Sequence, residues 1–126
     1  MILFVQGTSN PLSVQITNKH RKFKAIYLKQ YIIKGVSTSG GLPDMIFANL
    51  NLDNVNFQID GSYLRNDFNS GVPIPISKTL TNKEYDGDGL LLATDLNNIN
   101  DFKIRLTGRD GDLLVYTDAA FWFVFK

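Results

Sequence analysis

The stretch FWFVFK at residues 121–126 carries the strongest structural signal in the sequence. Successive side chains of a strand point to opposite faces, so Phe121, Phe123 and Phe125 share one face and Trp122 and Val124 share the other. An exposed strand this apolar would promote aggregation. The stretch therefore predicts a strand in the middle of a sheet, with the end of the chain tied into the hydrophobic core.

The same period of two recurs along most of the chain and predicts further strands. We expect them at residues 14–16, 23–32, 45–52, 55–59, 90–93, 102–107 and 113–116. The stretch 23–32 is apolar on both faces, which predicts a central, bent strand. Asp-Gly pairs at 60–61 and 110–111 are hairpin signals. Residues 95–100 leave room for a single helical turn.

Prolines alternate with apolar residues over positions 72–76. Because proline has no backbone N–H, this segment predicts an edge strand or an extended arm. We expect it to form an assembly surface, which comprises Val72, Pro73, Ile74, Pro75 and Ile76. The glycine-rich loop at 36–43 is a second expected assembly surface.

The size and composition of the chain fit one β-rich domain. With 126 residues and 44% hydrophobic residues, it has enough apolar material for a core of its own. The eleven Asp and twelve Asn residues favour turns over helices. About eight or nine strands separated by turn signals predict a sandwich or a barrel. We expect a single antiparallel β-sandwich over residues 1–126, an eight-stranded jelly roll.

The charges are unevenly distributed. Six of the 13 basic residues lie within the first 43 positions, which contain no Asp or Glu, and the other seven share the rest of the chain with all 12 acidic residues. This asymmetry predicts a polarised surface. The candidate contact residues are Lys19, Arg21, Lys22 and Lys24. They fit an acidic patch on a neighbouring subunit, nucleic-acid phosphates less well, or an ordinary solvated face.

The sequence offers little for catalysis or metal binding. It has no cysteine, which excludes disulfides and thiolate ligands. The single histidine, His20, stands among cations, and no serine lies in a nucleophile elbow. We expect neither an enzyme nor a cofactor. Five aspartates on predicted glycine-rich loops are oxygen ligands that calcium accepts, although they fit hairpin turns better: Asp86, Asp88, Asp110, Asp112 and Asp118.

Two further features concern ligands and membranes. Tyr63 and Tyr85 lie in predicted loops and are a candidate sugar platform, which leaves a carbohydrate-binding or other recognition module as the alternative function. The apolar start of the chain ends at Gln6-Gly7, too early for a signal peptide. No stretch approaches the length of a membrane span, so we expect no membrane insertion.

Several stretches together resemble single jelly-roll capsid proteins, in particular the minor capsid or penton proteins of virophages and polinton-like viruses. These stretches are FKAIYLKQYII (23–33), MIF (45–47) after a GGLP loop, VPIPI (72–76), KIRL (103–106), DGD (110–112) and FWFVF (121–125). The resemblance implies eight strands in two sheets, a closed homo-oligomer that contacts other capsid subunits in a virion, and no catalysis. A penton type would form a pentamer at a vertex, and a cement type would bridge larger capsomers.

Overall fold

Nine β-strands form the regular structure of the described part of the chain. The computed structural model describes residues 1–16, 23–37, 45–53, 71–94, 101–108 and 111–126. The strands are β1 (Ile2–Gly7), β2 (Leu12–Val14), β3 (Ala25–Lys34), β4 (Met45–Asp53), β5 (Val72–Ser77), β6 (Leu80–Glu84), β7 (Leu90–Thr94), β8 (Phe102–Thr107) and β9 (Asp118–Phe125). The described residues contain no helix.

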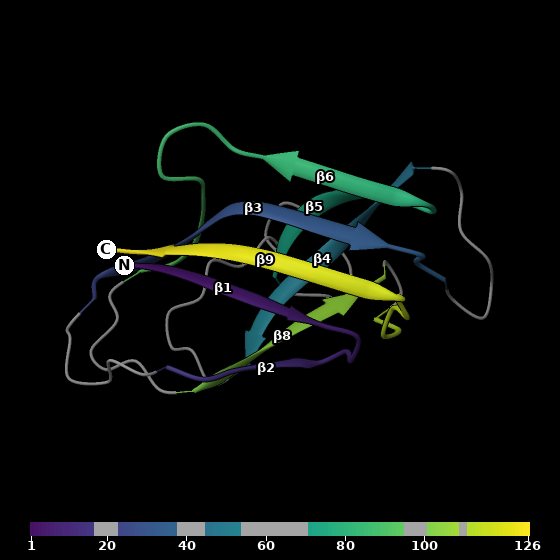
Figure 1. Cartoon of the computed structure of the whole chain (residues 1–126), viewed down its shortest axis with the longest axis horizontal. Helices are drawn as coiled ribbons and strands as arrows, with labels where there is room; N and C mark the ends of the chain where they lie inside the picture. Colours follow the sequence, from purple (N-terminus) through teal and green to yellow (C-terminus); the bar gives the residue numbers. More distant parts are fainter. Residues whose placement is uncertain (17–22, 38–44, 54–70, 95–100, 109–110) are drawn as a thin grey trace.

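The strands form two antiparallel sheets (Figure 1). One sheet has five strands in the order β1-β9-β3-β6, with β7 also paired to β3, and the other has four in the order β2-β8-β4-β5. Both sheets contribute to one core, where the rings of Phe102 in β8 and Phe123 in β9 meet edge to face at 6.1 Å. The predicted antiparallel β-sandwich is confirmed, and the jelly-roll arrangement stays a prediction.

The C-terminal strand lies where its sequence predicts. Figure 1 shows β9 between β1 and β3, so both of its edges are paired. Phe121, Phe123 and Phe125 are buried in the core, while Trp122 and Val124 lie half-buried on the opposite face. The period-two pattern at 121–125 is therefore confirmed residue by residue.

A bulge interrupts β3 at Lys29. Leu28 faces Phe123 and Gln30 faces Trp122, so Lys29 is an extra residue without a partner in β9. The extra residue changes the phase of the side chains, because two residues of one strand now oppose one of the other. Core-facing positions before and after the bulge therefore differ in parity: Ile26 and Leu28, then Tyr31 and Ile33.

The bulge also marks the place where β3 changes partner on its other edge. Residues 25–28 pair with β7, and residues 30–34 pair with β6. The turn at 85–89 lies between these two strands, as its Asp and Gly residues predict. Gly89 has a φ of +112°, and a Cβ there would lie 2.3 Å from the Leu28 carbonyl oxygen, so this close approach requires glycine.

Four parts of the chain differ from the expectation. The strand expected at 14–16 spans Leu12–Val14 instead, and residues 15 and 16 lie outside it. The strands β1 and β6 were not predicted, and residues 113–116 form only isolated bridges, Thr107 to Leu113 and Ser37 to Val115, instead of a strand. The expected strand at 55–59 and the helical turn at 95–100 lie outside the described residues. Among the described strands β5 ends the four-stranded sheet, the edge position that its prolines predict.

Candidate functional site

The outer face of the five-stranded sheet carries a row of apolar side chains. Opposed residues of antiparallel strands point to the same face, and Ile2 opposes Val124, which opposes Tyr27 on its other side. In the next row Phe4 opposes Trp122. We call these five side chains, Ile2, Phe4, Tyr27, Trp122 and Val124, the apolar outer face.

Exposure on this face is greatest at the edge strand. Ile2 is 71% exposed and Phe4 is 49% exposed, whereas Val124 and Trp122 are half-buried. The ring of Phe4 packs against that of Trp122 at a centroid distance of 4.8 Å. Among the described strands, β9 has a neighbouring strand on each side, but β1 has a neighbouring strand on one side only. The exposed apolar surface is therefore concentrated along the outer edge of β1.

The backbone of β1 also has an unpaired edge within the described residues. Phe125 N donates to Met1 O at 2.8 Å, and Met1 N donates to Phe125 O at 3.1 Å. In an antiparallel ladder such doubly bonded pairs alternate with residues whose N–H and C=O point away from the partner. Ile2, Phe4 and Gln6 therefore direct their backbone donors and acceptors away from β9.

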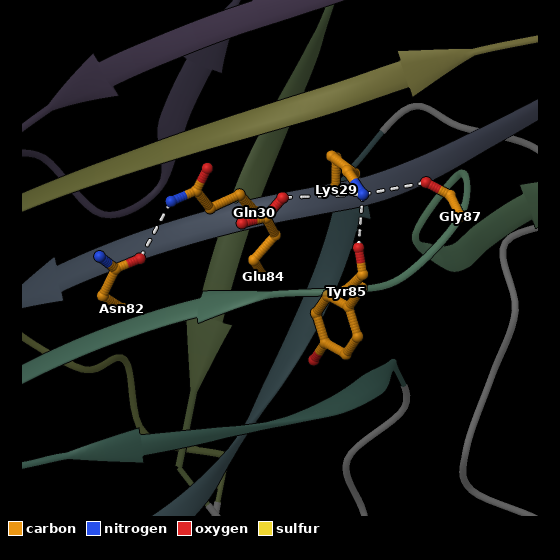
Figure 2. Close-up of polar contacts among 6 residues, drawn as sticks. All are labelled: Lys29, Gln30, Asn82, Glu84, Tyr85 and Gly87. Atoms are coloured by element: carbon orange, nitrogen blue, oxygen red, sulfur yellow. Dashed lines mark hydrogen bonds and ion pairs between the residues drawn. The ribbon is translucent and has the colours of Figure 1, made fainter.

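A polar cluster lies at the bulge, toward the β6 edge of the same sheet and away from β1 (Figure 2). The Lys29 ammonium donates to Tyr85 O at 2.6 Å and Gly87 O at 3.0 Å, and it lies 3.9 Å from a Glu84 carboxylate oxygen. Tyr85 N in turn donates to Lys29 O at 2.9 Å. Lys29 thus holds the turn between β6 and β7. Its ammonium is engaged by carbonyl groups, which indicates a structural role.

An amide pair lies next to this cluster. Gln30 Nε2 donates to Asn82 Oδ1 at 3.0 Å (Figure 2). The outer face therefore carries two amide side chains beside Glu84. Amide side chains can donate and accept hydrogen bonds at once. This face therefore combines aromatic rings with hydrogen-bonding groups on neighbouring strands.

Two buried tyrosines bind backbone carbonyls with their hydroxyl groups. Tyr31 donates to Pro75 O in β5, and Tyr116 donates to Ser9 O in the segment after β1. Burial, reinforced by Tyr85, raises the pKa of Tyr31 above its ordinary range. Burial, reinforced by the Asp118 charge, raises the pKa of Tyr116 to about 12. Both hydroxyls therefore stay protonated in the folded protein at neutral pH and act as donors.

Most of the predicted basic contact group cannot be placed. Lys19, Arg21 and Lys22 lie outside the described residues, as does His20. Lys24 is exposed, and its backbone N donates to Lys126 O at 2.5 Å beside the end of β9. One cation of the group therefore lies near the C-terminal end of β9, and the contact role of the group stays a prediction.

The side chains of the predicted assembly edge, residues 72–76, point alternately into the core and outward. Val72, Ile74 and Ile76 point into the core, and Pro73 and Pro75 are half-buried on the outer face of the four-stranded sheet. Of the loop at 36–43, the structure describes Val36, which is buried, and Ser37, which is exposed and bridged to Val115. The assembly role of both surfaces stays a prediction.

The expected sugar platform consists of Tyr63 and Tyr85, and Tyr63 lies outside the described residues. Tyr85 is half-buried, with its ring 6.3 Å from that of Tyr31 and 5.3 Å from the Lys83 ammonium. Burial raises the pKa of Tyr85. Its ring is thus partly engaged by neighbours on the core side of β3 and β6.

Two of the five candidate calcium aspartates have other partners. Asp88 forms an ion pair with Lys126 at 3.0 Å, and Asp118 accepts a hydrogen bond from Gln6 at 3.0 Å. Asp110 lies outside the described residues. Within the ranges that the structure covers, no three acidic or histidine side chains lie close enough together to hold a metal ion.

Sequence reasoning missed the apolar outer face. Its signal was present, because Ile2 and Phe4 alternate with Leu3 and Val5, and Trp122 was assigned to the face opposite the phenylalanines. What the sequence lacked was the pairing of β1 with β9, which brings the two segments together.

Comparisons with known proteins do not assign the chain to a group. No protein-family model matches it, and a search of curated proteins finds no significant match. In the described part of the chain, no helix has the length and apolarity needed to cross a membrane.

Proposed function

We propose that this protein is a structural subunit that works by assembling with copies of itself, as a jelly-roll component of a virion shell. The observation that carries the proposal is the nesting of the strand pairs. The first strand pairs with the last, β2 pairs with β8, β3 pairs with β6 and β7, and β4 pairs with β5. Together β6 and β7 occupy one strand position along β3, which leaves eight positions in two sheets.

This nested order supports a jelly roll, a double sheet of eight strand positions that is common in viral capsid and lectin domains. The resemblance of the sequence to minor capsid and penton proteins favours the capsid role. The virion would then be the location of the protein, and other capsid subunits would be its further partners. A penton, a minor capsid protein and a cement protein all fit this proposal.

The surface chemistry supports assembly. Ile2 and Phe4 are large apolar residues on one face of β1, and they are 71% and 49% exposed. Large contiguous patches of exposed apolar surface are rare on monomeric proteins, and where they occur they often mark protein–protein contacts. The basic N-terminal third supplies charge polarity, which orients subunits as they meet.

The test is the absolute mass in solution, measured by light scattering over a series of protein and salt concentrations. The proposal expects a closed oligomer whose mass reaches a plateau as the protein concentration rises. A contact made by the basic residues would weaken with salt. A monomer at every concentration, without other capsid subunits present, would contradict self-assembly.

A recognition module is the second candidate, because aromatic and amide side chains share the outer face of the five-stranded sheet. Trp122 and Tyr27 offer flat rings, and Gln30 and Asn82 offer hydrogen bonds in neighbouring rows. This arrangement fits a carbohydrate ligand. A glycan screen would show binding that Trp122→Ala abolishes and that Tyr85→Ala, on the core side of the sheet, leaves unchanged.

A further inference from the structure

We propose that β1 pairs with β1 of a second copy of this chain, antiparallel and about a two-fold axis that passes beside Phe4. The inference rests on the proposed function, self-assembly, and names a surface through which two copies meet. The two five-stranded sheets join into one continuous sheet across the axis.

The backbone of β1 provides the hydrogen bonds for this contact. The N–H and C=O groups of Ile2, Phe4 and Gln6 point away from β9, as the doubly bonded pair of Met1 and Phe125 establishes. In a two-fold arrangement centred on Phe4, this residue faces Phe4 of the second copy, and Ile2 faces Gln6. Every outward-pointing residue of β1 then has a partner.

The side chains of β1 fit the same contact. Outward-facing residues of β1 also carry the most exposed side chains of the apolar outer face, with Ile2 at 71% and Phe4 at 49% exposure. Pairing at β1 gives Phe4 a second aromatic neighbour on the side opposite Trp122. The apolar outer faces of the two copies become one surface.

The absence of charge favours a second copy of this chain as the occupant. Near a two-fold axis each residue approaches its own counterpart, so a charged residue there meets a like charge. Residues 1–18 contain no Asp, Glu, Lys or Arg.

Among the described edge strands, β2, β5 and β6 carry features that oppose pairing, and β1 carries none of them; β7 also lacks charge and proline, but none of its residues is exposed. Proteins protect edge strands by shortness, proline or charge. The edge strand β2 has only three residues, β5 contains two prolines, and β6 includes Lys83 and Glu84. The sequence ILFVQG of β1 has neither charge nor proline, and the strand extends over six residues.

Cysteine cross-linking tests the register directly, because the chain has no cysteine of its own. Facing residues of a doubly bonded antiparallel pair have Cα atoms about 5.5 Å apart, within the range of a disulfide. We expect untagged Phe4→Cys protein to form a covalent dimer under mild oxidation. The matched control is Phe47→Cys, which replaces an exposed phenylalanine of the other sheet. Equal cross-linking of the two variants would overturn the pairing.

A charge at the axis provides the second test. Phe4→Lys places two like charges opposite each other, and we expect self-association at least about tenfold weaker than in the wild type. Ile2→Lys, at the most exposed position, should weaken association with less risk to the fold. Phe47→Lys is the control, and thermal melting should show all three variants folded.

The outcomes separate this inference from the proposed function. If the wild type assembles and Phe4→Lys assembles equally well, pairing at β1 is overturned and self-assembly stands. If the wild type is monomeric up to the highest concentration measured, both are overturned.

Discussion

The two six-residue edge strands, β1 and β5, differ in how deeply their side chains are buried. In β5, Val72, Ile74 and Ile76 are buried and alternate with half-buried residues, so one face belongs to the core. In β1 no residue is fully buried, and exposed residues alternate with half-buried ones. Fully buried side chains therefore fix β5, whereas β1 contributes only the partly buried Leu3 and Val5 to the core and depends more on its ladder with β9.

The free edges differ as well. Pro73 and Pro75 have no N–H to offer to a further strand, and Pro75 O already accepts a hydrogen bond from Tyr31. The edge of β5 is thus closed to strand addition, although its side chains can still take part in a packed contact. The edge of β1 keeps the donors and acceptors of its outward-pointing residues. A sandwich can leave one edge open while it blocks another, and the open edge is where a partner strand can add.

Truncation of one apolar residue in each strand should give the largest difference. Ile74→Ala removes a fully buried side chain and should cost about 2–5 kcal/mol of unfolding free energy. Ile2→Ala removes an exposed side chain and should cost less than about 0.5 kcal/mol in the monomer. Urea unfolding at low protein concentration measures both. Equal costs would show that β1 packs as tightly as β5.

Alkaline pH should lower the free energy of unfolding through Tyr116, whose hydroxyl binds Ser9 O in the segment that follows β1. The pKa of Tyr116 is raised from 10.0 to about 12, so between these values the unfolded chain loses a proton that the folded protein retains. The stabilising contribution is fully present below pH 10 and is lost as the pH rises through about 12. The loss amounts to about 3 kcal/mol.

The Tyr116→Phe variant isolates this contribution, because phenylalanine does not titrate. Urea unfolding at pH 8 and pH 11.5 should show a smaller loss of stability in the variant than in the wild type. Identical losses would assign the alkaline sensitivity to other tyrosines.

Removal of the hydroxyl that closes the β5 edge should have a smaller effect. Tyr31→Phe keeps the buried ring and leaves Pro75 O without its donor, which should cost about 1 kcal/mol. Tyr27→Phe is the matched control, since its ring lies on the outer face of the same strand. Chemical unfolding at pH 7 compares the two, and a cost no greater than that of the control would mean that the Tyr31 hydroxyl does not stabilise the edge.

Replacement of the two prolines should change association more than stability. Pro73→Ala with Pro75→Ala restores two edge donors, at a cost of about 0.5–1 kcal/mol per site through the entropy of the unfolded chain. On a Phe4→Lys background, which blocks β1, we expect the double replacement to increase the mass measured by light scattering. An unchanged mass would show that the prolines do not protect this edge.

The fold was predictable where burial imposes an alternation on the sequence. Phe121, Phe123 and Phe125 in β9, and Phe102 and Ile104 in β8, follow this rule, because one face of each strand meets the core. The strand β6 escaped prediction because it has no buried residue and is held by backbone pairing with β3. The pattern at 113–116 was correct, with Leu114 and Tyr116 buried, but its partners change from Thr107 to Ser37, so no continuous strand forms.

The candidate surface was less predictable because it is assembled from distant segments. Ile2, Tyr27 and Val124 become neighbours only through the pairing of β1 with β9 and of β9 with β3. The apolar stretch 1–5 is too short for a signal peptide. Because the apolar run ends at Gln6-Gly7, the local pattern does not indicate that a strand continues through these two residues. Which edges remain unpaired depends on the order of the sheets, which a local pattern does not contain.

The extra residue in β3 has a consequence for how the protein tolerates changes in length. Deletion of Lys29 would remove the bulge and leave Tyr31 and Ile33 facing the core, at the cost of the Lys29 contacts that hold the turn between β6 and β7. Deletion of a residue beyond the bulge, such as Ile32, would instead turn Ile33 outward and shift the pairing with β6 and β9. Insertions and deletions in natural variants of this protein should therefore accumulate in the turns and, within residues 25–34, at the bulge.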